Sequence, residues 1–329
     1  MILVVSYPGD DHTAAVVELL LGDGREVVLL DAGSLGSTSS LELGYDRSGP
    51  TAHLVSEAGE FDLSTASSGW WRRLRTIEAD PSIVDPAALG FVHSETAEVF
   101  DGVVASLDAS WINPPAADAR AHHKPLQWSV ASTVGLGLPR TIVTRSPERA
   151  RAFVDELGTT GVITKAFLAR ADAWRETHRL EASDVERLDQ VRFAPTILQE
   201  YVPGVDLRVT MIDGEAYAAE IDATGTSLPS DMRMVLDEAD VQATVLPDGV
   251  VAALRHLMAE LGLVYGAIDL RRTPDGEYVF FEVNPAGLWL FAEELTGLPI
   301  TAALADALRR RDRDPSQMRA RAPRDMVVA

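Results

Sequence analysis

The opening of the chain limits the fold more than any other part of the sequence. Residues 2–5 (ILVV) form a short apolar run, Thr13 to Leu21 has the pattern of a helix, and Glu26 to Leu30 is a second apolar run that ends at Asp31. A strand, a helix and a strand within so short a span form a βαβ unit, which requires a parallel sheet. We therefore predict an α/β beginning.

The rest of the N-terminal part adds to this sheet. Residues 32–75 are rich in Gly and Ser with alternating short runs, which indicates a small antiparallel addition. Residues 95–107 have a helical pattern. The strand Trp111 to Asn113 is stopped by Pro114 and Pro115, because proline cannot donate to a sheet ladder. This stop marks the first predicted domain boundary.

Two hairpins dominate the later part of the chain. Asp213-Gly214 separates DLRVTMI from EAYAAEI, and the turn 274–276 (PDG) separates GAIDLRR from EYVFFEVNP. An Asp-Gly pair between two apolar runs is a strong hairpin signal. The other expected elements are helices over 124–134, 147–157, 249–261 and 293–308, and strands over 140–144, 161–165 and 196–202. The charged segment 170–190 could be a helix, a loop or both.

These elements divide the chain into four predicted parts. They are an N-terminal α/β domain over 1–115, a central α+β subdomain over 116–194, a C-terminal α+β subdomain over 195–312, and a flexible basic tail over 313–329. The basic run from Arg309 to Arg324 is interpreted as solvated.

Composition excludes several classes of function. The 329 residues include no cysteine, so disulfides, thiolate metal sites and cysteine nucleophiles are excluded. The net charge of −21 argues against a nucleic-acid partner. No apolar run approaches the roughly 20 residues that span a bilayer, and the first strand lacks the basic region of a signal peptide. We expect a cytoplasmic protein without a membrane partner.

The polar residues whose pattern is most specific for a site are Asp269, Glu282 and Asn284, on the two strands of the second hairpin. Strand alternation places 282 and 284 on one face, and Asp269 can lie opposite them. Two carboxylates and an amide oxygen form the hard-oxygen site that suits magnesium with nucleotide phosphates. An exposed hairpin face with unrelated acids is the alternative.

Several other residues carry a weaker signal. Lys124 begins a helix and Lys165 ends an apolar strand, so each is either a surface lysine or a phosphate contact. The strand 199–202 (QEYV) could offer its backbone to an adenine edge, or could be sheet alone. Arg208 and Arg233 each follow an Asp by two residues and either form a salt bridge or bind a substrate carboxylate or phosphate.

Three familiar site types are not supported. The seven histidines lack ligand spacing, which argues against zinc. Neither a P-loop motif nor a G-x-S-x-G elbow occurs.

In chain order the motifs are Lys124, Lys165, QEYV at 199–202, DLR at 206–208, DLR at 269–271 and EVNP at 282–285. This order resembles the ATP-grasp superfamily. The sequence is most similar to its graspetide (microviridin-type) ribosomal peptide maturases, or macrocyclases, of the actinobacterial branch. More specific similarities are WWRRL at 70–74, WINP at 111–114, KPLQ at 124–127, GLGLPRT at 135–141 and NPAGLWL at 284–290.

The resemblance implies a role for each site residue. ATP phosphates would contact Lys124 and Lys165, the adenine would contact Gln199, Glu200, Tyr201 and Val202, and the ribose region would contact Asp206. Magnesium would be held by Asp269, Glu282 and Asn284. The catalytic residues would be Arg208, Arg233 and Lys165, with both arginines facing the acidic side chain of the peptide. Two departures concern this pocket: Met232 stands where the family often has Trp, and Ala286 to Leu288 replace a more polar Asn-Gly-Gln.

By this resemblance the protein would use ATP and Mg²⁺ to phosphorylate Asp or Glu side chains of a ribosomal precursor peptide. A Ser or Thr hydroxyl of the peptide would then form an ester, or a Lys amine would form an amide. Segment 170–192 falls where the family receives the leader peptide, and a homodimer is compatible with the family. Two alternatives remain: a RimK-like or small-molecule carboxylate–amine ligase, and a nucleotide-binding protein without ligase turnover.

Overall fold

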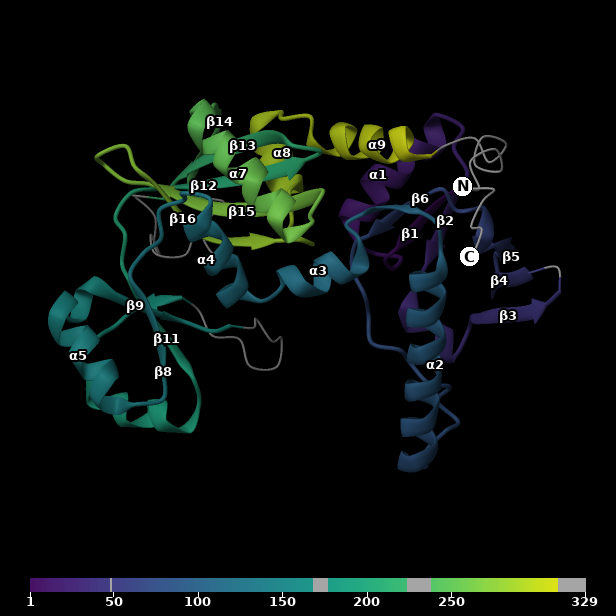
Figure 1. The fold of residues 1–329 in the computed structure, drawn as a ribbon, viewed down its shortest axis with the longest axis horizontal. Coiled ribbons are helices and arrows are strands. Elements are labelled where there is room, and N and C mark those ends of the chain that lie inside the picture. Colours follow the sequence, from purple (N-terminus) through teal and green to yellow (C-terminus); the bar gives the residue numbers. More distant parts are fainter. Residues whose placement is uncertain (48, 168–176, 224–237, 313–329) are drawn as a thin grey trace, which may run out of the picture.

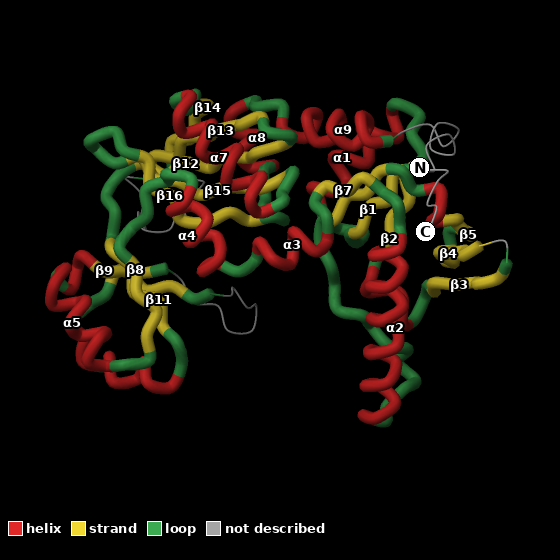
Figure 2. The backbone as a smooth tube through the Cα atoms, in the orientation of Figure 1, coloured by secondary structure: helices red, strands yellow, loops and turns green. Residues whose placement is uncertain are grey.

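The computed structural model describes residues 1–47, 49–167, 177–223 and 238–312. The molecule is extended, with the N-terminal sheet on one side and two further sheets on the other (Figure 1). The chain crosses from the first part to the others through α3 (Pro115–Ala121) and α4 (Lys124–Thr133), the two consecutive helices in the middle of Figure 2.

The N-terminal sheet is parallel, as predicted. Its strands follow the order β2-β1-β6-β7, with β1 at Ile2–Val5, β2 at Val27–Leu30, β6 at Ser68–Trp71 and β7 at Ser110–Ile112. All four residues of β1 are buried, which explains its unbroken apolar sequence. The helix α1 (Asp11–Gly22) begins where the Asp10 carboxylate accepts a hydrogen bond from the amide of Thr13.

The expected antiparallel addition is also confirmed. It consists of β3 (Ser40–Asp46), β4 (Gly49–Ser56) and β5 (Gly59–Asp62), which pair in the order of the sequence. The second helix, α2, is longer than predicted and covers Pro86–Ser106. Short 3-10 turns lie at Ala32–Gly36 (η1) and Leu63–Thr65 (η2).

The second sheet is small and antiparallel, with the order β10-β9-β11-β8. Its elements are β8 (Thr141–Thr144), α5 (Pro147–Leu157), η3 (Thr159–Gly161), β9 (Val162–Lys165), β10 (His178–Arg179), α6 (Ala182–Glu186), η4 (Leu188–Phe193) and β11 (Thr196–Glu200). Helix α5 packs its buried Ala150, Phe153 and Val154 against Val162 and Leu198 of the sheet.

The third sheet is antiparallel and has five strands in the order β14-β13-β12-β15-β16. They are β12 (Val205–Ile212), β13 (Glu215–Asp222), β14 (Asp240–Thr244), β15 (Tyr265–Arg272) and β16 (Tyr278–Asn284). Both predicted hairpins are confirmed. The first turns at Asp213 and Gly214, which have φ of 51° and 83°, as a tight hairpin turn requires. Helices α4 and α7 (Asp248–Leu261) contribute to the core on one face of this sheet.

The prediction of one helix over 293–308 is wrong. The structure has α8 (Leu290–Thr296) and α9 (Ile300–Arg311), with a break at Gly297 to Pro299. Gly297 adopts a left-handed φ of 73° and ends α8, and Pro299 directly precedes α9. Helix α9 lies beside α1 and packs against β6 and β12 (Figure 1). It therefore joins the N-terminal sheet to the five-stranded sheet.

The interpretation of Arg309 to Arg324 as a solvated run is wrong for its first residues. Arg309, Arg310 and Arg311 form the last turn of α9. Arg309 pairs with Asp23, and the two residues after it pair with Asp213 of the hairpin turn. Residues 313–324 lie outside the described part of the chain.

Candidate active site

The three predicted metal ligands occupy neighbouring positions on β15 and β16. Asp269 is the register partner of Glu282, and Ala267 is the partner of Asn284. A register shift after Asp269 leaves Phe281 without a partner, so Phe280 and Val283 both enter the core. Glu282 and Asn284 thereby remain at the solvent-accessible side of β16. The structure thus brings the three side chains to one end of the second hairpin.

Two basic side chains pair with these carboxylates. Lys124, the first residue of α4, forms an ion pair with Glu282. Nη1 of Arg208 on β12 lies 2.8 Å from Oδ1 of Asp269 on β15. This contact lacks the geometry of a hydrogen bond, and Oδ1 of Asp269 is a buried atom without a hydrogen-bond donor among the described residues. Acidic and basic groups therefore alternate across the end of the sheet.

Helix α4 is fixed to β16 by side chains that bind the strand's backbone. Gln127 accepts a hydrogen bond from the amide of Val283 at 3.0 Å and donates to its carbonyl at 2.8 Å. Trp128 Nε1 donates to the carbonyl of Phe281 at 3.0 Å. Residues three and four apart lie on one face of a helix, so these bonds place Lys124 over Glu282. Trp128 was not among the predicted site residues, although it lies four residues after Lys124 in the sequence.

Lys165 reaches the same place from β9. Its ammonium lies 5.7 Å from the ring centre of Phe281 and 5.9 Å from that of Trp128, within the range of cation–π attraction. Lys124 and Lys165 thus converge on the adjacent residues Glu282 and Phe281. The small antiparallel sheet and the five-stranded sheet meet at this point.

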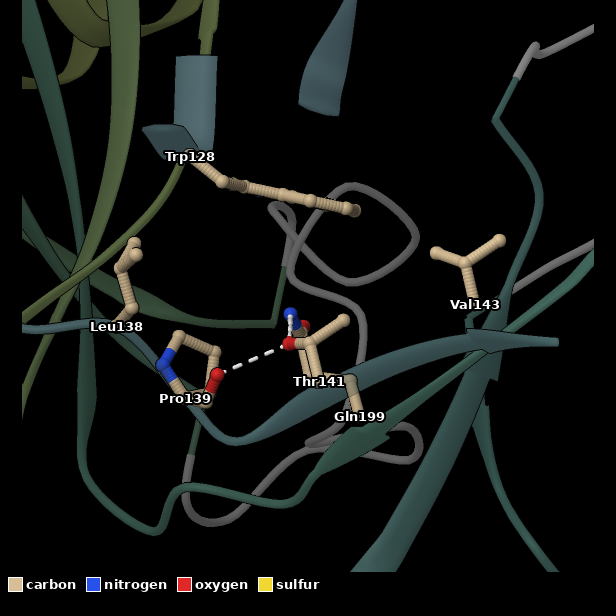
Figure 3. A pocket seen from close by; sticks show the side chains of 6 residues that line it. All are labelled: Trp128, Leu138, Pro139, Thr141, Val143 and Gln199. Atoms are coloured by element: carbon tan, nitrogen blue, oxygen red, sulfur yellow. Dashed lines mark hydrogen bonds between the residues drawn. The ribbon is translucent and has the colours of Figure 1, made fainter. Parts of the chain in front are cut away.

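A cavity of about 240 Å³ lies beside this junction, lined by Trp128, Leu138, Pro139, Thr141, Val143 and Gln199 (Figure 3). The Trp128 indole forms one wall, and Thr141 and Gln199 lie on the strands opposite. Gln199 donates to Thr141 Oγ1 at 2.8 Å, and its buried Oε1 has no hydrogen-bond donor among the described residues. A flat aromatic wall with an available acceptor suits a planar heteroaromatic ring that carries an amino group.

The other residues predicted to bind the nucleotide lie at the end of β11. Glu200 accepts a hydrogen bond from the amide of Arg140. The ring of Tyr201 lies under the Arg179 guanidinium, 4.0 Å from its carbon. The carbonyl of Val202 accepts a hydrogen bond from Arg271 at 2.9 Å. These contacts fix the backbone that leads from the small sheet to the five-stranded sheet.

Asp206 forms an ion pair with Arg271 inside the protein. Both of its carboxylate oxygens accept hydrogen bonds from Arg271, at 2.6 and 2.8 Å, and both residues are buried. Its contact with ribose therefore stays a prediction. The sequence analysis placed Arg271 within a motif without assigning it a role, whereas the structure places its guanidinium 5.4 Å from the Phe281 ring centre.

Some predicted positions cannot be located. Arg233 and Met232 lie outside the described residues, as does part of the leader-peptide segment, 170–176. Within the described ranges, no group of three or more His, Cys, Asp or Glu side chains is arranged as a metal site. The residues predicted to hold magnesium, Asp269, Glu282 and Asn284, combine two acids with an amide. No helix of the described chain is long and apolar enough to cross a membrane.

Comparisons with known proteins give matches over different parts of the chain. Residues 1–119 match the family model of the MvdD pre-ATP grasp domain. The probable alpha-L-glutamate ligase 1 of Pseudoalteromonas atlantica is 27% identical over 180 residues, 53% of this chain. The chain spans 58% of the length of that curated relative.

Solved structures match over nearly the whole chain. The macrocyclase MdnC from Microcystis aeruginosa MRC, bound with the precursor peptide MdnA, is 27% identical with a TM-score of 0.83. That match covers 94% of this chain and 99% of MdnC. The ATP-grasp ligase PsnB, complexed with minimal precursor, Mg and ADP, is 25% identical with a TM-score of 0.76 and covers 94% and 98% of the two chains.

Proposed function

We propose that this chain, whose residues 1–119 match the MvdD pre-ATP grasp domain and whose fold matches that of MdnC, is an ADP-forming ATP-grasp ligase that crosslinks a ribosomal precursor peptide. The observation that carries the proposal is the row of opposite charges at the end of the five-stranded sheet. Lys124 pairs with Glu282, Arg208 pairs with Asp269, and Lys165 approaches from the facing sheet.

The acidic side of this row fits a magnesium ion. Asp269 and Glu282 supply carboxylates and Asn284 an amide oxygen, the donors that Mg²⁺ prefers. Oδ1 of Asp269 is buried and already faces a cation, the Arg208 guanidinium at 2.8 Å, which is the kind of charge that Mg²⁺ would supply there. Bound there, Mg²⁺ would neutralise charge on the nucleotide phosphates.

The basic side of the row fits the phosphates. Lys124, Lys165 and Arg208 gather three cations around one end of the sheet, and charge-assisted contacts to phosphate are strong. A bound triphosphate would give Lys124 and Arg208 anionic partners in place of Glu282 and Asp269. The cavity at Trp128 and Gln199 would receive the adenine, with Tyr201 and Val202 beside it.

The chemistry follows from this arrangement. An Asp or Glu carboxylate of the peptide attacks the γ-phosphorus of ATP, which gives an acyl phosphate and ADP. A Ser or Thr hydroxyl, or a Lys amine, of the same peptide then attacks the acyl carbon, loses a proton and releases inorganic phosphate. Positioning and charge neutralisation supply most of the catalysis in phosphoryl transfer, so the lack of a cysteine nucleophile is no obstacle. Arg208, and Arg233 by resemblance, would hold the reacting carboxylate.

The match to a probable glutamate ligase favours a second candidate, a ligase that joins small carboxylates and amines. The peptide ligase is preferred because the structural match to MdnC covers almost both whole chains. Dependence on a precursor peptide separates the two candidates.

The test is incubation with ATP, Mg²⁺ and a candidate precursor peptide encoded beside this gene, followed by mass spectrometry. We expect the peptide to lose the mass of one water per ring, with one ADP formed for each. An unchanged peptide, together with ADP formation stimulated by free amino acids, would favour the small-molecule ligase and contradict the proposal.

A further inference from the structure

The loop that follows the proposed magnesium ligand Asn284 is held by a residue from the other end of the molecule. Arg72 directly follows β6 of the N-terminal sheet, and it is only 2% exposed. Its Nη1 donates hydrogen bonds to the carbonyl of Ala286 at 2.6 Å and to the carbonyl of Gly287 at 3.1 Å. A side chain of the N-terminal domain thus binds the backbone beside the candidate active site.

Arg72 is itself held in place. Its Nε donates to the carboxylate of Asp10 at 3.1 Å, and its guanidinium carbon lies 5.1 Å from the ring centre of Trp289. Asp10 also accepts from the amide and hydroxyl of Thr13, at the first turn of α1. Burial acts to raise the pKa of Asp10, but these hydrogen bonds and the Arg72 charge outweigh it and lower that pKa. The Asp10 carboxylate therefore stays ionised at neutral pH.

The contact with Ala286 leads directly to Asn284. The amide of Ala286 donates a hydrogen bond at 3.1 Å to Oδ1 of Asn284, the oxygen proposed to bind magnesium. The backbone of Ala286 therefore accepts a hydrogen bond from Arg72 and donates one to Asn284. A displacement of Ala286 would turn the Asn284 side chain away from Asp269 and Glu282.

The other side of the loop is closed by close packing. A Cβ atom on Gly287 would lie 2.3 Å from the Cβ of Ala267, the register partner of Asn284. The hydroxyl of Tyr265 also donates to the carbonyl of Gly287 at 2.8 Å. The loop is thus enclosed between β15 and Arg72, which leaves the Asn284 oxygen little freedom.

We propose that Arg72, supported by Asp10, is a positioning residue for the Asn284 amide oxygen, so that the N-terminal domain sets the geometry of the magnesium site. This inference rests on the proposed function. Partners that orient metal ligands typically change metal affinity 10- to 100-fold when they are replaced. If Arg72 only fastened the two domains together, its replacement would lower stability and leave magnesium binding unchanged.

The experiment measures ADP binding by calorimetry with and without Mg²⁺, alongside thermal melting. Arg72→Lys keeps the charge beside Asp10, but a single ammonium cannot bind Asp10 and two carbonyls in the geometry of the guanidinium fork. The double variant Asp10→Asn with Arg72→Gln removes both buried charges and answers the same question if the lysine variant does not fold. Ser67→Ala is the matched control, since it removes a hydrogen bond to Asp312 from the same domain without touching Asp10, Arg72 or the loop.

We expect the wild-type protein to bind ADP more tightly with Mg²⁺. In the Arg72 variants this magnesium-dependent gain should fall by about 10-fold or more. Binding of ADP without Mg²⁺ should not change, and Ser67→Ala should behave like the wild type. A folded Arg72 variant that keeps the full gain overturns the positioning role. If the ADP affinity of the wild-type protein is the same with and without Mg²⁺, then the proposed magnesium site itself is wrong.

Discussion

At the scale of single residues, the Lys124–Glu282 ion pair gives the most direct test of the magnesium site. Glu282→Gln keeps the size of the side chain and removes one of two carboxylates, so ADP formation should fall by at least about 10-fold. The Glu282 side chain is 27% exposed, and pairs of this kind contribute only about 0–1 kcal/mol, so the melting temperature should barely move. Glu220→Gln is the control, since Glu220 pairs with Arg272 and is 25% exposed. Unchanged ADP release in Glu282→Gln would refute the assignment.

The partners of the buried charges could not be predicted from residue spacing. Arg208 follows Asp206 by two residues, and this spacing suggests a salt bridge within the strand. In the structure β12 and β15 run antiparallel, so Asp206 faces Arg271 and Arg208 faces Asp269. Each pair crosses between strands, because the register of the sheet decides which side chains meet. The grouping of Asp269 with Glu282, by contrast, followed from alternation and one hairpin turn, and it needed no long-range information.

At the scale of elements, the attachment of α4 to β16 determines where Lys124 lies. Gln127→Leu would leave the Val283 amide and carbonyl buried without their partner, and each unsatisfied group costs about 1–3 kcal/mol. We expect a loss of unfolding free energy of at least that size, measured by urea denaturation, and weaker nucleotide binding. Ser129→Ala, on the exposed side of the same helix, should change neither quantity. Equal stability of Gln127→Leu and the wild type would show that the helix is held by its apolar contacts alone.

Most elements with strong local signals were predicted, whereas contacts between distant parts of the chain were not. The βαβ opening, the antiparallel addition and both hairpins followed from apolar periodicity and turn residues. The break between α8 and α9 was missed, although Gly297 and Pro299 mark it in the sequence. The support of the Asn284 loop by Arg72 was also missed, because Arg72 and Ala286 are 214 positions apart and only the tertiary fold brings them together.

At the scale of the whole molecule, the N-terminal domain and the five-stranded sheet share one hydrophobic core. Val4 and Trp70 from the first sheet, Ile212 from β12, and Trp289 and Leu304 near the C-terminal helices belong to a single buried cluster. The predicted ATP-grasp fold is confirmed by the match to the ATP-grasp ligase PsnB, which covers 94% of this chain and 98% of PsnB. Since the domains are joined through this core, groups buried there should affect the stability of the protein as a unit.

His12 lies in this core and should make global stability depend on pH. Burial, with the nearby charge of Arg72, lowers its pKa to about 4; Asp10 opposes the shift, and Arg73 adds to it. A histidine kept neutral in the folded state contributes stability above the unfolded pKa of about 6.5, and this is lost as the pH falls toward 4. Between pH 7 and pH 5 we expect a loss of about 2 kcal/mol from this group.

The comparison that isolates His12 is urea unfolding of the wild type and of His12→Phe at both pH values. Phenylalanine keeps a ring against Trp289, whose centre lies 4.3 Å from that of His12, and it removes the titrating nitrogen. The Nδ1 atom of His12 is buried without a hydrogen-bond partner among the described residues, so the substitution breaks no such bond at this atom. The variant should therefore lose less stability than the wild type on acidification. If both proteins lose the same free energy, then the pKa of His12 in the folded core equals its unfolded value and the acid sensitivity arises from other groups.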